Sequence, residues 1–124
     1  MYVEYEDHRV KELFEDLNNI QGSKNLMRRQ IGTEMTKKVK MKYSQMTSFT
    51  NFAQLLESRI GKIESLVGEE KGTYSLRITK NYRLIVLAKS TDLSPEGLKK
   101  CDTFYIKGVI DYHGQGANNN WLIP

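Results

Sequence analysis

The first half of the chain carries apolar residues at helical spacing. Between Asp7 and Asn18 they recur every three or four residues, and Gly22-Ser23 then offers a break. A longer stretch with the same period runs from Met27 to Met46, with lysines on its other faces. A short third helix is expected from Asn51 to about Ser58, with Thr50 as its cap. The pattern predicts three helices, the first two paired as a hairpin.

The second half of the chain alternates with the period of two that strands require. Tyr74 to Ile78 alternates like a half-buried strand, and Tyr82 to Ala88 is apolar enough for the centre of a sheet. Because Thr79-Lys80-Asn81 makes a short turn, these two strands are expected to pair in antiparallel fashion. Lys89 to Asp102 is a polar excursion, after which Thr103 to Tyr112 forms the last strand.

Helices followed by an antiparallel sheet indicate an α+β fold. Residues 1–124 are expected to form one domain, with a helical part at 7–58, a sheet at 62–113 and a tail at 114–124. Ile63 to Leu66 is a candidate for a further short strand. Since the helices would cover one face of the sheet, the other face is the expected place for function.

The last strand ends on Asp111-Tyr112-His113, three residues with side chains suited to acid-base chemistry. Without a bulge, alternation places Phe104, Ile106, Ile110 and Tyr112 on one side and Lys107, Val109, Asp111 and His113 on the other. A carboxylate beside an imidazole would hold the ring and favour its protonated form, so Asp111 and His113 suit proton transfer. The alternative is an ordinary surface histidine preceded by a turn-forming aspartate.

Two arginines, Arg77 and Arg83, lie on the strands about thirty residues upstream. A guanidinium can grip phosphate oxygens at two points, so the pair is a candidate phosphate site. The alternative is a structural role, in which the arginines form salt bridges to Glu69, Glu70 or Asp111.

Charge is unevenly distributed along the chain, which has a net charge of +4 and a pI near 9.1. Residues 1–16 are acidic, whereas residues 24–42 carry seven basic side chains against Glu34 alone. The basic stretch is either a phosphate-binding surface or a solvated helix face.

Composition gives no indication of export, a metal or a cofactor. Cys101 is the single cysteine, so no internal disulfide is possible, and no run of apolar residues is long enough to span a bilayer. His8 and His113 are the two histidines, and no cysteine or carboxylate pattern has metal-ligand spacing. A cytoplasmic protein without cofactors is the default expectation.

From about Phe14 to His113 the chain resembles the HigB family, within the RelE/ParE superfamily of toxins from type II toxin-antitoxin systems. The resemblance is carried by Gly68, then Lys71 to Ile78, then Asn81 to Leu84, and finally Val109 to His113. It implies the same α+β fold, with two N-terminal helices on an antiparallel sheet. The Lys89 to Asp102 excursion and the tail extend beyond the family pattern.

The resemblance implies an endoribonuclease that cuts messenger RNA, usually on the ribosome, by attack of a ribose 2′-OH on the adjacent phosphate without a metal. By position Arg83 would stabilise the charged phosphate with Arg77 as helper, while Asp111, Tyr112 and His113 would form the catalytic triplet. His113 would be the main acid or base. Tyr112 would stack on a base or orient the phosphate, unless alternation turns it inward. The candidate RNA-binding lysines are Lys62, Lys71, Lys80 and Lys107.

The implied partners are messenger RNA, the ribosome and a cognate antitoxin, a helix-turn-helix or otherwise small DNA-binding protein that would carry the complex to its operator. Two other functions remain open. A ParE-like toxin would poison DNA gyrase by binding, and a non-catalytic module would bind RNA through the basic second helix. The tail segment Trp121-Leu122-Ile123 would either pack on the sheet or contact a partner.

Overall fold

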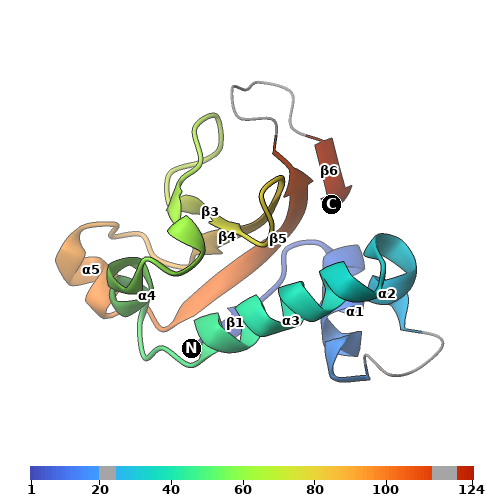
Figure 1. Cartoon of the computed structure of the whole chain (residues 1–124). Helices are drawn as coiled ribbons and strands as arrows, with labels where there is room; N and C mark the ends of the chain where they lie inside the picture. The colour runs from blue at the N-terminus through green and yellow to red at the C-terminus, as the bar shows by residue number, and fades with distance from the viewer. Residues whose placement is uncertain (20–24, 113–119) are drawn as a thin grey trace.

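The computed structural model describes residues 1–19, 25–112 and 120–124, and it shows an α+β fold with helices on one side of a six-stranded sheet (Figure 1). The helices are α1 (His8–Glu15), α2 (Leu26–Ile31), α3 (Thr33–Thr47), α4 (Phe52–Ser58) and α5 (Pro95–Lys99), with 3-10 turns η1 (Asp16–Asn19) and η2 (Ile60–Lys62). The strands are β1 (Tyr2–Glu4), β2 (Glu64–Ser65), β3 (Thr73–Arg77), β4 (Tyr82–Ala88), β5 (Thr103–Asp111) and β6 (Asn120–Ile123). None of the described helices is both long and apolar enough to cross a membrane.

The sheet has the order β1-β5-β4-β3-β2, and β6 also pairs with β5. β2, β3, β4 and β5 form antiparallel neighbours, as the sequence predicts. β1 is the exception, because it runs parallel to β5 along Thr103–Tyr105, whereas β6 pairs antiparallel with Val109–Asp111. The predicted antiparallel sheet is therefore confirmed in its central strands, whereas the parallel strand β1 was not expected. Two short strands share the outer edge of β5.

The core lies between the helices and one face of the sheet, which we call the helix face. Its strand residues include Leu76, Leu84, Val86, Phe104, Ile106 and Val109. They meet apolar side chains from α1, α3 and α4, including Val10, Phe14, Val39, Met46, Phe52 and Leu55. The opposite face, here the second face, carries Thr73, Ser75, Arg77, Arg83, Ile85, Leu87 and Ile110.

The long apolar stretch forms two helices rather than the single one expected. The break lies at Gly32, whose φ of 87° is unfavourable for other residues, and the Gly32 N–H still closes α2 by donating to Arg28 O at 2.8 Å. Met27, Val39 and Met46 keep their predicted buried positions on either side of the break. Because the buried apolar residues keep their helical spacing across Gly32, the spacing alone did not predict the break between α2 and α3.

The shorter helices begin at capping side chains. Asp7 caps α1 by accepting from Arg9 N, which makes the expected start nearly correct, although the last residues of the predicted helix form η1. α4 is capped by Asn51, which accepts from Gln54 N at 2.9 Å, and not by Thr50 as expected. The backbone N–H of Thr50 instead donates to the Gln54 side chain.

A β-bulge in β5 reverses the faces predicted for the end of that strand. Val86 pairs with Ile106 and Ile85 with Gly108, so Lys107 is an extra residue on β5. Val109 therefore joins Ile106 on the helix face, while Ile110 moves to the second face beside Arg83. The expected grouping of Phe104 and Ile106 with Ile110 and Tyr112 is wrong for this reason.

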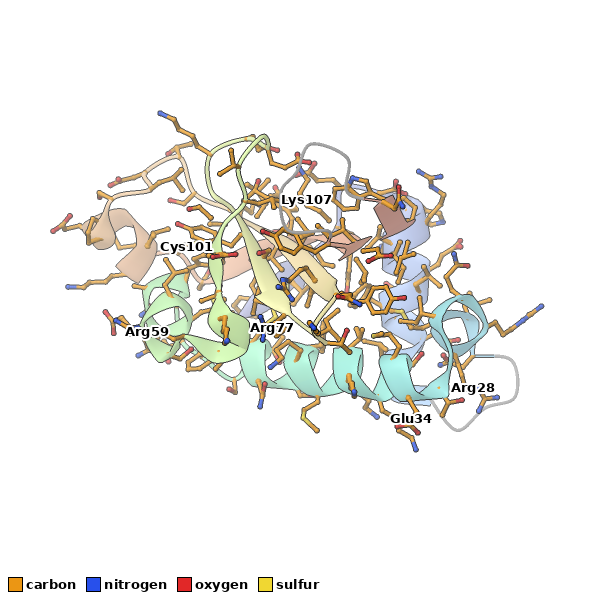
Figure 2. All side chains as sticks on the ribbon, turned by 45° about the horizontal axis from the view of Figure 1, so that its top comes forward. Arg28, Glu34, Arg59, Arg77, Cys101 and Lys107 are labelled. Carbon is orange, nitrogen blue, oxygen red and sulfur yellow. The ribbon has the colours of Figure 1, made fainter. Side chains whose placement is uncertain are left out.

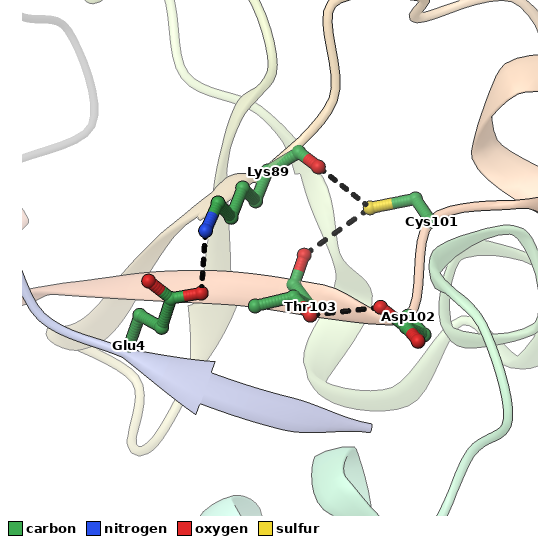
Figure 3. Close-up of polar contacts among 5 residues, drawn as sticks. All are labelled: Glu4, Lys89, Cys101, Asp102 and Thr103. Carbon is green, nitrogen blue, oxygen red and sulfur yellow. Dashed lines mark hydrogen bonds and ion pairs between the residues drawn. The ribbon is translucent and has the colours of Figure 1, made fainter.

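The excursion between β4 and β5 is structured, since it contains α5 and returns to the sheet through a set of polar contacts (Figure 3). Cys101 is buried, and its thiol contacts the carbonyl oxygens of Lys89 at 3.6 Å and Thr103 at 3.2 Å. The Lys89 ammonium pairs with Glu4 on β1 at 2.7 Å. These contacts join the excursion to the edge where β1 is added.

Candidate phosphate-binding site

Arg77, which is labelled in Figure 2, is the direct cross-strand partner of Arg83 at the end of the β3–β4 hairpin. Directly paired residues on antiparallel strands have Cβ atoms roughly 5 Å apart and point to the same face. Both arginines therefore lie on the second face, as a phosphate site on neighbouring strands requires. Two like charges in this arrangement repel each other unless an anion lies between them.

Arg83 is held in place by the hairpin turn, although it is charged and only 8% exposed. Its Nη1 donates to the carbonyl oxygens of Thr79 at 3.0 Å and Lys80 at 3.2 Å. Burial, and next the positive charge of Arg77, lower the pKa of the Arg83 guanidinium, against opposing effects of Tyr112 and Glu64. An arginine remains a cation at neutral pH despite such a shift. The site thus holds a fixed positive charge with little water around it.

Arg77 brings a second positive charge whose hydrogen-bonding capacity is incompletely used. Its Nε is buried and has no hydrogen-bond partner within the described residues. A buried unsatisfied donor is costly, so it marks a place where a ligand oxygen would be favourable. The backbone of Arg77 packs closely on Gly61, which fixes the base of this side chain.

Neither arginine forms an ion pair with a carboxylate anywhere in residues 1–19, 25–112 and 120–124. Glu69 and Glu70 pair instead with Lys107, at 3.9 and 3.2 Å. Asp111 pairs with Tyr82 across the strands and so lies on the helix-face side. The alternative in which Glu69, Glu70 or Asp111 neutralises the arginines is therefore wrong.

Of the predicted catalytic triplet Asp111-Tyr112-His113, the structure shows only Tyr112 beside the arginine pair. Tyr112 lies against Arg83, whose guanidinium carbon is 4.8 Å from the ring centroid, and the Tyr112 N–H donates to Asn81 O at 2.6 Å. Tyr112 does not point into the core as alternation had predicted, because the bulge turns it outward. Asp111 does not share the arginine face, and His113 lies outside the described residues.

The four candidate lysines fall into two groups. Lys62, Lys71 and Lys80 are exposed, and in the described part of the chain they make no ion pair. Lys80 lies in the turn that holds Arg83, and Lys62 adopts a left-handed φ of 48° at the end of η2. Lys107 is the bulge residue and is committed to Glu70 and Glu69, so its charge is already balanced.

Two features of the site were not predicted from the sequence. The face reversal has a sequence signal in Gly108, since a glycine inside a strand pattern often marks a bulge. The hydrogen bonds from Arg83 to the two turn carbonyls could not be predicted, because backbone oxygens are present whatever the side chains of the turn are.

No group of three or more histidine, cysteine or carboxylate side chains with metal-binding geometry occurs within the described ranges.

The Arg77→Met variant is expected to unfold at the same or a higher temperature than the wild type in low-salt buffer without phosphate. It removes the repulsion and the unpaired Nε, and relief of a like-charge cross-strand pair is worth roughly 0.2–1 kcal/mol. Added phosphate should stabilise the wild type more than the variant in thermal unfolding. Arg59→Met, at an exposed arginine after α4, is the control and should keep the full phosphate response.

Comparisons with known proteins identify no relative: no family model, curated protein or solved structure matches the chain.

Proposed function

We propose that the protein is an endoribonuclease of the RelE/HigB type, which binds a phosphodiester of single-stranded RNA between Arg77 and Arg83 and cleaves it. The observation that carries the proposal is this cross-strand arginine pair, with which no carboxylate in the described residues forms a direct ion pair, although the charge of Glu64 acts on Arg83 at longer range. A structural arginine pair would be expected to have acidic partners, whereas an anion-binding pair leaves that place to its ligand.

The arrangement suits the charge that develops during phosphodiester cleavage. When an oxygen nucleophile adds to phosphorus, negative charge grows on the two non-bridging oxygens. Two guanidiniums on adjacent strands offer donors to both oxygens. Because the turn carbonyls already orient Arg83, little reorganisation is needed as the charge grows. Burial also strengthens the attraction, since fewer water dipoles screen it.

In the proposed reaction the ribose 2′-OH loses its proton to a base, and its oxygen attacks the adjacent phosphorus. The bond from phosphorus to the 5′-oxygen breaks, and that oxygen takes a proton from an acid. The products are a 2′,3′-cyclic phosphate and a 5′-hydroxyl. His113 is the proposed acid or base, as the resemblance implies.

The other two members of the triplet receive more limited roles. Tyr112 is assigned to orienting the phosphate-binding arginine, because its ring lies against the Arg83 guanidinium. Asp111 lies at the end of the same strand on the helix-face side, so its proposed role is to position the strand end rather than to contact the phosphate. Lys62, Lys71 and Lys80 are proposed to bind the RNA backbone, while Lys107 is retained by Glu70.

The proposed substrate is messenger RNA on the ribosome, and the proposed regulator is a cognate antitoxin that binds operator DNA. Moderate basicity supports dependence on the ribosome, because a net charge of +4 holds free RNA weakly at physiological salt. Expression of the protein would then stop translation and growth.

A second candidate is a non-catalytic RNA-binding module. It is favoured by the exposed cations on α2 and α3, which include Arg29, Lys37 and Lys38. These helices lie on the helix side of the sheet (Figure 1), whereas the strand pairing places the arginine pair on the second face. The two candidate functions therefore use separate surfaces and are separable by substitution.

Expression of the wild type in bacteria, with mapping of RNA 5′ ends and analysis of end groups, tests the proposal. We expect growth arrest together with new 5′-hydroxyl ends inside reading frames, and the matching upstream fragments should carry cyclic phosphates. Growth arrest with intact messengers, accompanied by loss of plasmid supercoiling, would favour the ParE-like alternative. RNA binding by purified protein without cleavage on translating ribosomes would favour the binding module.

A further inference from the structure

Trp121 is an exposed aromatic residue on the same face as the arginine pair. It lies on β6, its side chain is 41% exposed, and it is the one tryptophan in the chain. Cross-strand pairing connects it to the site, because Arg77 pairs with Arg83, Arg83 with Ile110, and Ile110 with Trp121. These residues form one row across β3, β4, β5 and β6 on the second face.

The spacing within this row matches the size of a nucleotide. Neighbouring strands lie about 4.8 Å apart, so Trp121 starts roughly 10 Å from Arg83 on the sheet surface. Between them lies Ile110, which is 1% exposed and presents no polar group. A phosphate held by the arginines would therefore place the base of an adjoining nucleotide within reach of the indole ring.

The neighbours of Trp121 on β6 contact the core and α2, whereas the Trp121 side chain stays exposed on the second face. Residues two apart on a regular strand share a face, yet Ile123 is fully buried in the core and Trp121 is not. The pairing of Ile123 with Val109 and of Trp121 with Ile110 makes Leu122 a bulge residue, which separates the two side chains. Gln30 on α2 donates to the Leu122 carbonyl at 3.2 Å, which fixes β6 against the helices.

We propose that Trp121 is a stacking platform for a nucleobase of single-stranded RNA, next to the phosphate held by Arg77 and Arg83. Bases stack on aromatic side chains largely irrespective of their identity, and fixed cations beside the ring attract the backbone. An exposed tryptophan with no charge nearby would fit a protein partner equally well, but this one shares its row with two guanidiniums that form no direct ion pair with a carboxylate of the described residues. The inference rests on the proposed RNA function and adds a base-binding position to it.

Two matched trinucleotides test the inference with the whole protein at low salt. One is a 2′-O-methylated RNA trimer, which lacks the attacking hydroxyl, and the other is the abasic trimer with the same phosphates. The intrinsic fluorescence of the wild type reports directly on Trp121, because no other tryptophan contributes. Affinities of the variants are measured by fluorescence polarisation of end-labelled trimers, with circular dichroism as the check on folding.

We expect the base-containing trimer to quench Trp121 emission and to bind about tenfold more tightly than the abasic trimer, since stacking is worth about 1–3 kcal/mol per base. Trp121→Ala should remove this difference, whereas Trp121→Phe should keep most of it. Met41→Ala, at an exposed apolar residue on α3, should behave like the wild type. If Trp121→Ala does not fold, the wild-type comparison and Trp121→Phe still decide the question.

Equal binding of both trimers by the wild type, without quenching, would overturn the stacking platform. If Arg83→Gln then abolished that binding, the phosphate site and the proposed function would stand without it. If the wild type bound neither trimer and cleaved no RNA on ribosomes, the proposed function would fall together with the inference.

Discussion

The Arg83→Gln variant is expected to cleave RNA about 10²- to 10³-fold more slowly than the wild type in single-turnover reactions. This is the usual effect of removing one donor that stabilises charge in a transition state. Arg83 is the buried and oriented member of the pair, so its loss should exceed that of Arg77. The rate is measured on translating ribosomes with the protein in excess, which separates the chemical step from product release.

Two further variants separate charge from geometry and from location. Arg83→Lys keeps the positive charge but loses the planar fork, so its rate should lie between those of the wild type and Arg83→Gln. Arg29→Gln removes an exposed arginine from α2 and should leave the rate unchanged. If Arg29→Gln impaired RNA binding while Arg83→Gln did not, the basic helices would be the RNA surface and the arginine-pair proposal would be wrong.

The folding check for Arg83→Gln is important because the side chain also holds the hairpin turn. Two carbonyl oxygens, of Thr79 and Lys80, accept from the same Nη1. A glutamine amide can replace at most one of these two hydrogen bonds, so we expect the free energy of unfolding to fall by about 1 kcal/mol from their loss alone. A variant that is folded at the assay temperature but inactive would support a role in the reaction itself.

The sequence was sufficient for the α+β fold and for most of the central elements. The β4 bounds were predicted as Tyr82 to Ala88 and are confirmed, because a run of apolar β-branched and aliphatic residues between two turns leaves little choice. β1 was missed because three residues carry almost no periodic signal, and its partner lies about a hundred residues away. α5 was missed because its five residues are too few for helical periodicity to be visible.

The sequence predicted the two arginines of the candidate site, but not the faces on which Asp111 and Tyr112 lie. Arg77 and Arg83 stand on opposite sides of a short turn, so their pairing follows from the hairpin itself. The placement of Asp111 and Tyr112 depends on the bulge at Lys107, which one inserted residue creates and which reverses every later side chain on β5. Trp121 and Ile123 are separated by a second bulge of the same kind. Simple alternation therefore holds at neither place, and the prediction that it overturned was the one made for the end of β5.

Gly108→Ala is expected to lower the free energy of unfolding by about 3 kcal/mol, through detachment of β6 from β5. A Cβ at Gly108 would overlap the backbone of Ile123 and Pro124, and the φ of +148° disfavours any other residue. Backbone atoms cannot rotate away as a side chain would, so the chain must give up the pairing, and Ile123 then loses its buried position. Urea unfolding measures the change in stability.

The detachment also has a spectroscopic signature, because Trp121 lies on the strand that is released. Its emission should shift to longer wavelength in the folded variant as the ring becomes fully hydrated, and the preference for the base-containing trimer should disappear. Gly68→Ala is the matched control, since Gly68 has a similar requirement for positive φ but open space around its Cβ position. It should cost about 1–2 kcal/mol and leave the emission unchanged. If Gly108→Ala cost no more than Gly68→Ala, with Trp121 emission unaltered, close packing of β6 on β5 would not be needed to hold the tryptophan beside the arginine pair.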